Sequence, residues 1–430
     1  MNLANVRSAI AVTIAPAALV AAAIALLLGL HAAGAGFQGD PLAVVRDAPP
    51  GDRLFDVAGR RAPVIGITLL VWLAAFAVMM AAERLSTRSG APFPSQRRER
   101  RTGRVAARLL ALSLVYLPLL CLAGAALEPS VGAERFLVML GAPALAALTL
   151  AALGGYRALA FACGATVLAY AIDLIAGSPL TQLSLAGPNP AGGHRYYGVG
   201  NELEAALVAI VLVGIGAALS APVRLSRPRD GKGAPEHASA SFLVVASIFT
   251  FVFAFGRYGA DVGAAITLPL GAAVAAAVAA GRLRLAWLAC LLPLPALVVL
   301  AAADLLTGAD AHLTSSVLDA GSGGDVLAVL GDRLREAGES FGRPILLAGL
   351  PVVVIAAVTA WLRRDRLAVW LRDVPAMRAG LLGALAATLV GTLANDSGAL
   401  LLEIGAVYLL VFIAFAWAES DRPDRGRGIV

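Results

Sequence analysis

The sequence predicts an all-α protein, a polytopic bundle of about 12 transmembrane helices that forms a single integral membrane domain over residues 1–430. Hydrophobic residues make up 59% of the chain and charged residues only 14%, whereas soluble domains carry about 25% charged residues. Apolar stretches of about 20 residues recur along the chain, and this length crosses a hydrocarbon core of roughly 30 Å. Basic residues concentrate in every second connection between these stretches, which is typical of helices that cross a membrane repeatedly.

The first predicted span covers 9–33 and follows a lone Arg7. Its apolar stretch exceeds the roughly 7–15 residues of a signal peptide's apolar core, which favours an uncleaved anchor over a cleaved signal ending near 32–35. The remaining spans are predicted over 63–82, 105–127, 136–153, 158–176, 203–221, 240–256, 264–281, 285–303, 344–362, 379–394 and 399–418. Because the last two are short and flank Asn395-Asp396, a single broken helix or a re-entrant hairpin is the alternative there.

The positions of the charges predict that both termini lie in the cytoplasm of a multi-pass protein of the bacterial plasma membrane. One set of connections and span ends holds 24 of the 34 basic residues, and the opposite set holds 19 of the 28 acidic residues. Connections rich in arginine and lysine stay in the cytoplasm. The predicted cytoplasmic loops are 83–104, 222–239 and 363–378, and the predicted outer loops are 34–62, 177–202 and 304–343.

The outer loop 304–343 contains a predicted amphipathic helix over 325–341. Its apolar side chains recur at helical spacing, with charges on the opposite face, and they are Val326, Leu327, Leu330 and Leu334. Such a helix lies on the outer surface of the membrane. It is expected to be a lid or brace over the bundle, with substrate contact as the alternative.

Composition and motifs exclude several function classes. The net charge of +6 follows from the cytoplasmic loops, so it indicates membrane topology rather than a nucleic-acid partner. Cys121, Cys163 and Cys290 lie inside apolar stretches without the spacing of metal ligands, and we expect them to be small buried hydrophobic residues. The chain has no Gly-x-x-x-x-Gly-Lys-Ser/Thr, His-Glu-x-x-His or Gly-x-Ser-x-Gly motif, and His194 alone indicates no metal site. The sequence therefore identifies no cofactor.

The stretch 194–204, His-Arg-Tyr-Tyr-Gly-Val-Gly-Asn-Glu-Leu-Glu, joins an outer loop to a long apolar span. Its two glycines permit a tight turn or the close approach of a ligand, and an arginine there is suited to bind a phosphate or carboxylate. The predicted substrate-binding residues of this stretch are His194, Arg195, Tyr197 and Asn201. Glu202 is a candidate catalytic base.

Structural explanations of the same stretch stay open. Glu202 and Glu204 fall in the first turn of the span, where acidic side chains cap free N–H groups and are favoured by the helix dipole. The tyrosines fit an interfacial aromatic belt. Arg195 fits a simple ion pair with Glu202 or Asp261.

Two later stretches are predicted to reach the same outer level. Arg257 and Asp261 are four residues apart and share one face if the preceding helix continues, so a plain ion pair is the alternative to a site. Asn395-Asp396-Ser397-Gly398 interrupts an apolar hairpin and also fits a simple turn. Arg257, Asn395 and Ser397 join the predicted substrate-binding residues, and Asp261 and Asp396 join the catalytic candidates.

Glu403 completes the predicted substrate-binding set. It lies seven residues beyond Asp396, about 10 Å deeper on nearly the same face of a helix. A carboxylate at that depth is too far from the start of the helix to cap its free N–H groups. Its alternative role is as a buried partner of Arg195 or Arg257.

The ordered motifs Arg-Tyr-Tyr-Gly-Val-Gly-Asn at 195–201, Tyr-Gly-Ala-Asp at 258–261 and Asn-Asp-Ser-Gly at 395–398 resemble those of a group of uncharacterised polytopic membrane proteins of Gram-positive bacteria. The likeness covers roughly 170–400 and implies only that these positions matter. The layout also looks loosely like membrane glycosyltransferases that use lipid-linked sugars and carry an acidic residue in the first outer loop. That loop offers Asp40, Asp47, Asp52 and Asp56 here, without an Asp-Asp, Glu-Asp or Asp-Glu pair.

Three function classes fit this pattern. The first is an outward-facing polar site that acts by group transfer on a lipid-linked or anionic envelope precursor, with Asp261, Asp396 or Glu202 as base. The second is a secondary transporter or flippase coupled to protons or sodium, with those carboxylates and Glu403 binding the ion. The third is a non-catalytic scaffold of an envelope complex. The expected partners are membrane lipid and a lipid-linked substrate, and the shallow depth of most candidates favours group transfer.

Overall fold

The computed structural model of the chain describes residues 56–57, 59–88, 93–127, 130–188, 197–221, 234–307, 335, 337–342, 350–362, 364–395 and 397–420. All regular structure within these residues is helical. Ten helical segments among them are long and apolar enough to cross a membrane. The protein is therefore a multi-pass membrane protein of all-α class, as the sequence predicts.

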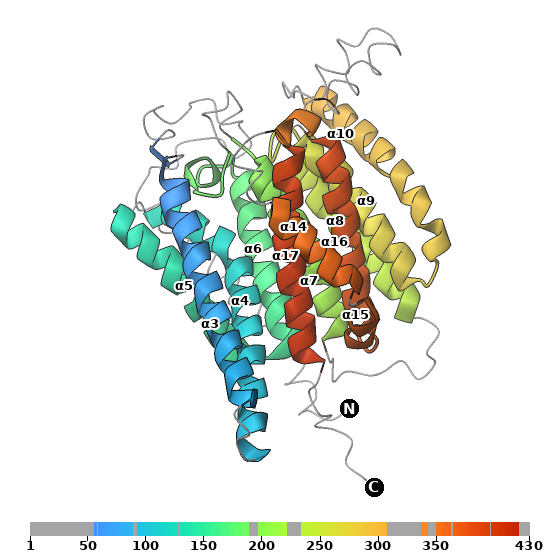
Figure 1. Cartoon of the computed structure of the whole chain (residues 1–430). Coiled ribbons are helices and arrows are strands. Elements are labelled where there is room, and N and C mark those ends of the chain that lie inside the picture. The colour runs from blue at the N-terminus through green and yellow to red at the C-terminus, as the bar shows by residue number, and fades with distance from the viewer. Residues whose placement is uncertain are drawn as a thin grey trace, which may run out of the picture.

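The long helices run roughly along one common axis, and consecutive long helices run in opposite directions (Figure 1). The long helices are α3 (Ile67–Arg88), α4 (Phe93–Leu127), α5 (Val131–Ala152), α6 (Gly155–Ile175), α7 (Asn201–Ser220), α8 (Ala234–Ala254), α9 (Val262–Ala279), α16 (Pro375–Ala394) and α17 (Gly398–Glu419). The shorter elements are η1 (Ala62–Gly66), η2 (Thr181–Leu183), η4 (Leu283–Leu291), α10 (Pro293–Thr307), α14 (Leu350–Leu362) and α15 (Arg364–Trp370).

The observed helices match most of the predicted spans. The last two predicted spans are separate helices, α16 and α17, so the single broken helix is excluded. The span predicted over 285–303 is divided into η4 and α10 at Pro293, because proline lacks a backbone N–H and fits the first turn of a helix. The span 9–33 lies outside the described residues, as do most of 325–341 and the beginning of 344–362.

The centre of the bundle is formed by α7, α9 and α16, which pack against one another. Glycines allow their backbones to approach closely. A Cβ atom added to Gly383 of α16 would lie 2.5 Å from the carbonyl oxygen of Gly271 in α9, and one added to Gly380 would lie 2.6 Å from the carbonyl oxygen of Leu212 in α7. Small residues serve the same purpose at helix contacts in lipid, where there is no hydrophobic force between helices.

The two ends of the bundle differ in charge among the described residues. We call the end with the N-termini of α5, α7, α9 and α17 the acidic end, and the opposite end the basic end. The acidic end holds more acidic residues than arginines. The acidic residues are Asp56, Glu134, Asp173, Glu202, Glu204, Asp261, Glu339 and Glu403, and the arginines are Arg60, Arg61, Arg135, Arg257 and Arg335. The basic end holds more arginines than acidic residues. The arginines are Arg104, Arg108, Arg157, Arg282, Arg284, Arg364, Arg366, Arg372 and Arg378, and the acidic residues are Glu236, Asp365, Asp373 and Glu419.

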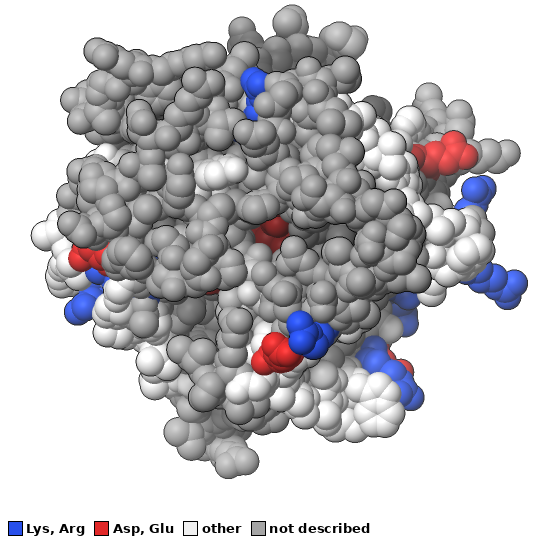
Figure 2. All heavy atoms as spheres, turned by 90° about the horizontal axis from the view of Figure 1, so that it is seen from above, with Lys and Arg blue, Asp and Glu red and all other residues white. Residues whose placement is uncertain are grey.

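The acidic end therefore carries the polar residues that the sequence analysis singles out. Figure 2 looks down on this end, and an acidic side chain is visible near the centre of the view. The side of the bundle is apolar instead, with exposed Leu70, Phe136, Leu148 and Val298 on α3, α5 and α10. That surface suits contact with lipid.

Candidate functional site

The three polar stretches of the sequence meet at the acidic end. The N–H of Val199 donates to the carbonyl oxygen of Gly259 over 2.8 Å, which joins the first stretch to the second. Gly198 has a φ of +78°, and any Cβ atom there would overlap the same carbonyl group. The Asn395 amide donates to Asn201 Oδ1 over 3.3 Å, which joins the third stretch to the first. Segments almost 200 residues apart thus form one site.

The second stretch is held in a tight turn between α8 and α9. The N–H of Gly259 donates to the carbonyl oxygen of Val252, and the N–H of Asp261 donates to that of Phe253, both over 3.0 Å. The ring of Tyr258 packs edge-on against Phe255, with the ring centroids 5.1 Å apart. This turn ends α8 at Ala254, so the helix does not continue to Asp261, and Arg257 and Asp261 do not share a helix face.

Glu204 lies at the centre of the site. Its side chain is on the first turn of α7 and is only 1% exposed. One carboxyl oxygen, Oε1, accepts a hydrogen bond from Thr267 Oγ1 over 2.8 Å, and Oε2 accepts one from Asn395 Nδ2 over 3.0 Å. Among the described residues, Glu204 forms no ion pair with an arginine or lysine.

Asp261 provides a second buried carboxyl group beside the first. It is 4% exposed and caps α9, since its Oδ1 accepts a hydrogen bond from the N–H of Gly263 over 3.1 Å. Its carboxyl group lies near that of Glu204 and interacts with it electrostatically. A Cβ atom on Gly263 would overlap Glu204 Oε2 and lie 2.8 Å from Asn395 Nδ2. The absence of a side chain at Gly263 therefore lets α9 approach the two polar groups.

We call Asn201, Glu204, Asp261, Thr267 and Asn395 the carboxyl cluster. The orientation of the Asn395 amide within it is fixed by the backbone. Its Oδ1 accepts a hydrogen bond from the N–H of Ser397 over 3.2 Å. Because a backbone N–H can only donate, the amide oxygen faces Ser397 and the NH₂ group faces Glu204.

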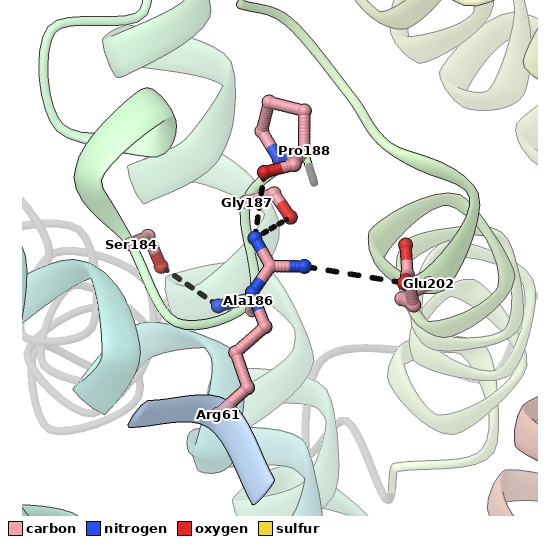
Figure 3. Close-up of polar contacts among 6 residues, drawn as sticks. All are labelled: Arg61, Ser184, Ala186, Gly187, Pro188 and Glu202. Carbon is pink, nitrogen blue, oxygen red and sulfur yellow. Dashed lines mark hydrogen bonds and ion pairs between the residues drawn. The ribbon is translucent and has the colours of Figure 1, made fainter. Parts of the chain in front are cut away.

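Arg61 organises the outer side of the same helix turn (Figure 3). Its Nη2 donates to the carbonyl oxygens of Gly187 and Pro188, both over 2.6 Å, and its Nη1 lies 3.9 Å from Glu202 Oε1. The neighbouring Arg60 turns to other partners, Glu134 at 3.1 Å and Asp56 at 3.3 Å. Glu202 thus pairs with an arginine from the chain segment before α3.

Some of the other predicted site residues lie outside the described part of the chain, and the rest differ in how close they are to the carboxyl cluster. His194, Arg195 and Asp396 lie outside the described residues, so the pairing predicted for Arg195 stays a prediction. Tyr197 and Arg257 are half-buried near the cluster, and Ser397 is buried beside Asn395. Glu403 is half-buried on α17. Among the described residues it makes no hydrogen bond or ion pair, so no polar contact connects it to the carboxyl cluster.

The sequence analysis missed Thr267 and Arg61, and it did not place Glu204 among the site residues. Thr267 sits in an apolar stretch with no polar neighbour, so no local signal marks it. Arg61 is one of two adjacent arginines, and its partners Gly187, Pro188 and Glu202 come from distant parts of the chain. Within the described part, no group of three or more His, Cys, Asp or Glu side chains is arranged to hold a metal ion. Comparison with family models, with curated proteins and with solved structures finds no match.

Proposed function

We propose that the protein is a proton-coupled secondary transporter of the bacterial plasma membrane, and that the carboxyl cluster binds the proton. One observation carries the proposal. The carboxyl groups of Glu204 and Asp261 lie close together, both nearly without exposure to solvent, and no described arginine or lysine forms an ion pair with Glu204. Two such groups in a medium of low dielectric constant are not both charged unless a cation compensates them.

A proton or cation shared by the two groups changes the net charge of the cluster. Since Glu204 connects α7 to α9 through Thr267 and to the end of α16 through Asn395, that change acts on three helices at once. Ionisable groups that face the interior of a membrane bundle frequently mark proton or ion pathways. Coupling of ion binding to helix movement is the requirement for a secondary transporter.

The donors around Glu204 favour a proton over sodium. Hard cations are bound by oxygen atoms that point their lone pairs at the ion. Here Asn395 presents its NH₂ group to Glu204 and turns its oxygen to the backbone of Ser397. The single hydroxyl hydrogen of Thr267 lies within reach of both Glu204 and the Gly263 carbonyl oxygen. These donors stabilise a carboxylate that is free to exchange a proton, whereas they repel a metal ion.

The arrangement in the membrane completes the proposal. The basic end would face the cytoplasm, in agreement with the positive-inside bias. The ten helical segments that are long enough to cross a membrane, together with the predicted span 9–33 and the shorter α14, would give 12 spans with both termini in the cytoplasm. The carboxyl cluster would then lie near the outer surface, at the first turns of α7 and α9.

Group transfer on a lipid-linked or anionic envelope precursor is the second candidate. The convergence of three polar stretches favours it, since a site for a large substrate requires residues from several segments. Arg257 and Asn201 at the acidic end would hold the anionic group, and Asp261 would act as base. The burial of the two carboxyl groups favours the transporter, because a transferred group must reach its base directly.

Proton binding can be measured directly, and this test requires no knowledge of the substrate. The full-length protein in liposomes, adsorbed on a solid-supported membrane, should give a transient current after a jump in pH. Glu204→Gln should abolish this current, because glutamine keeps the size of the side chain and an acceptor oxygen for Asn395 but takes up no proton. Glu339→Gln, at an exposed position of the acidic end, should leave it unchanged. An equal current from Glu204→Gln, or none from the unmodified protein, would contradict the proposal, and substrate turnover in detergent without a gradient would support group transfer.

A further inference from the structure

The arginines of the basic end fall into two groups that differ in their contacts. On the side of α4, α6 and α17 they have partners within the protein. Arg108 pairs with Glu419 over 2.6 Å. Arg104 lies over the ring of Trp417, 5.7 Å from its centroid, and Arg157 also has an interaction partner. On the side of α9 and α16, six exposed arginines form no ion pair and no side-chain hydrogen bond with any described residue. We call them the arginine surface, and they are Arg282, Arg284, Arg364, Arg366, Arg372 and Arg378.

The arginine surface spans two connections that lie side by side. Arg282 and Arg284 follow the end of α9, and the other four lie between the end of α14 and the first turn of α16, on α15 and beside it (Figure 1). α9 and α16 pack against each other and run in opposite directions. Gly271 and Gly383, which lie eight residues from the end of α9 and from the start of α16, are in contact. The end of α9 and the start of α16 are therefore neighbours at the basic end.

Large apolar side chains are exposed among these arginines. Trp287 is 66% exposed, Trp361 64% and Leu362 68%. The guanidinium group of Arg364 lies over the ring of Trp361, 5.4 Å from its centroid. Tryptophan is typical of the level where the hydrocarbon of a membrane meets the lipid headgroups. An arginine side chain at this level extends its charged group to the headgroups while its stem stays on apolar surface.

The charge of these two connections favours an anionic partner. Asp365 and Asp373 are the acidic residues among their described positions, so six arginines outnumber two carboxylates. A guanidinium group binds a phosphate with two parallel hydrogen bonds. A phospholipid provides the phosphate together with acyl chains that cover the exposed tryptophans. A soluble acidic protein would match the charges but not the apolar side chains, which lie where the membrane spans end.

We propose that the arginine surface binds the headgroups of anionic phospholipids in the membrane leaflet at the basic end. The guanidinium groups hold the phosphates, and Trp287 and Trp361 lie against the upper part of the acyl chains. Basic residues directly beside membrane spans are known to recognise anionic lipids in this way. The interaction does not rest on the proposed function, since it requires neither a proton nor the carboxyl cluster.

Lipid selection can be measured by native mass spectrometry. The purified full-length protein in detergent is mixed with equal amounts of phosphatidylglycerol, which is anionic, and phosphatidylcholine, which is zwitterionic, and the lipids that stay bound are counted. The unmodified protein should retain phosphatidylglycerol in preference. Arg364→Gln/Arg366→Gln should lower this preference about fivefold or more, because one arginine near an anionic lipid contributes roughly that factor to binding.

Arg104→Gln/Arg157→Gln is the matched control. It removes the same charge from the same end, but both arginines have partners within the protein, so the lipid preference should stay at the unmodified value. An equal loss in the two double variants would refute the arginine surface, because net charge alone would then attract the lipid. An unmodified protein without a preference would refute it as well and would leave a soluble acidic molecule as the partner.

A second measurement requires no variant and decides if Arg364→Gln/Arg366→Gln fails to fold. The unmodified protein is placed in phosphatidylcholine liposomes that contain a small fraction of brominated lipid, since bromine quenches tryptophan fluorescence on contact. Brominated phosphatidylglycerol should quench more strongly than brominated phosphatidylcholine, because Trp287 and Trp361 lie beside the arginines. Equal quenching by the two lipids would overturn the proposal.

Discussion

Gly263 determines how closely α9 approaches the buried carboxyl group of Glu204. Any side chain there would occupy space that Glu204 Oε2 and Asn395 Nδ2 fill. This contact joins residues far apart in the sequence, and none of them signals it locally. The sequence identifies Asp261, Asn201 and Asn395 as candidates because polar residues are rare in lipid-crossing stretches. It cannot identify Gly263 or Thr267, whose roles depend on which helices pack together.

Gly263→Ala should destabilise the protein by about 1–3 kcal/mol, because the added methyl group overpacks the cluster. Gly164→Ala in α6 is the control, since a Cβ atom there meets nothing within 4 Å. That control should be neutral or slightly stabilising, as alanine favours helix more than glycine does. Thermal unfolding in detergent measures both, and equal unfolding temperatures for the two variants would show that the close approach does not matter.

The helix boundaries show which elements the sequence can predict. The spans predicted over 203–221 and 264–281 are observed as α7 (Asn201–Ser220) and α9 (Val262–Ala279), within two residues at either end. Apolar length is a strong signal, so these elements are predictable. The end of α8 at Ala254 likewise lies within two residues of the predicted end at 256. The turn after it could not be predicted, because it depends on backbone hydrogen bonds to Val252 and Phe253.

At the scale of the element, Asp261 has two functions that substitution can separate. Asparagine caps a helix about as well as aspartate, so Asp261→Asn should keep the start of α9 while removing the second carboxyl group. Asp261→Ala removes both and should be less stable than Asp261→Asn by about 1 kcal/mol. Thermal unfolding of the two variants gives the value of the cap alone. If alanine were as stable as asparagine, the hydrogen bond to Gly263 would contribute nothing to α9.

The whole molecule is organised by the contrast between its acidic and basic ends. Counting charges along the sequence predicts this contrast, and the described residues have it. The sequence does not predict which polar residues of one end meet, because every span end there lies at a similar depth. Helix packing makes that selection, through glycine contacts such as Gly271 with Gly383.

Labelling of single cysteines tests the orientation of the molecule. In a variant without the three native cysteines, Gly132→Cys reports on the acidic end and Arg372→Cys on the basic end, and both positions are exposed. If the basic end faces the cytoplasm, a membrane-impermeant maleimide should label Gly132→Cys in intact cells and Arg372→Cys only after permeabilisation. The reverse result would place the carboxyl cluster on the cytoplasmic side.

The contact between Gly198 and Gly259 also restricts how this sequence can diverge. Neither glycine tolerates a side chain, since a Cβ atom on Gly198 overlaps Gly259 and one on Gly259 overlaps the carbonyl group of Phe253. Lipid-facing positions such as Leu148 are free to drift among apolar residues. A distant descendant that keeps the site would therefore share few letters with this chain, but it would keep two glycines, one just before the first turn of α7 and one just before the cap of α9. That sparse pair is the pattern by which such relatives can be traced when overall similarity has vanished.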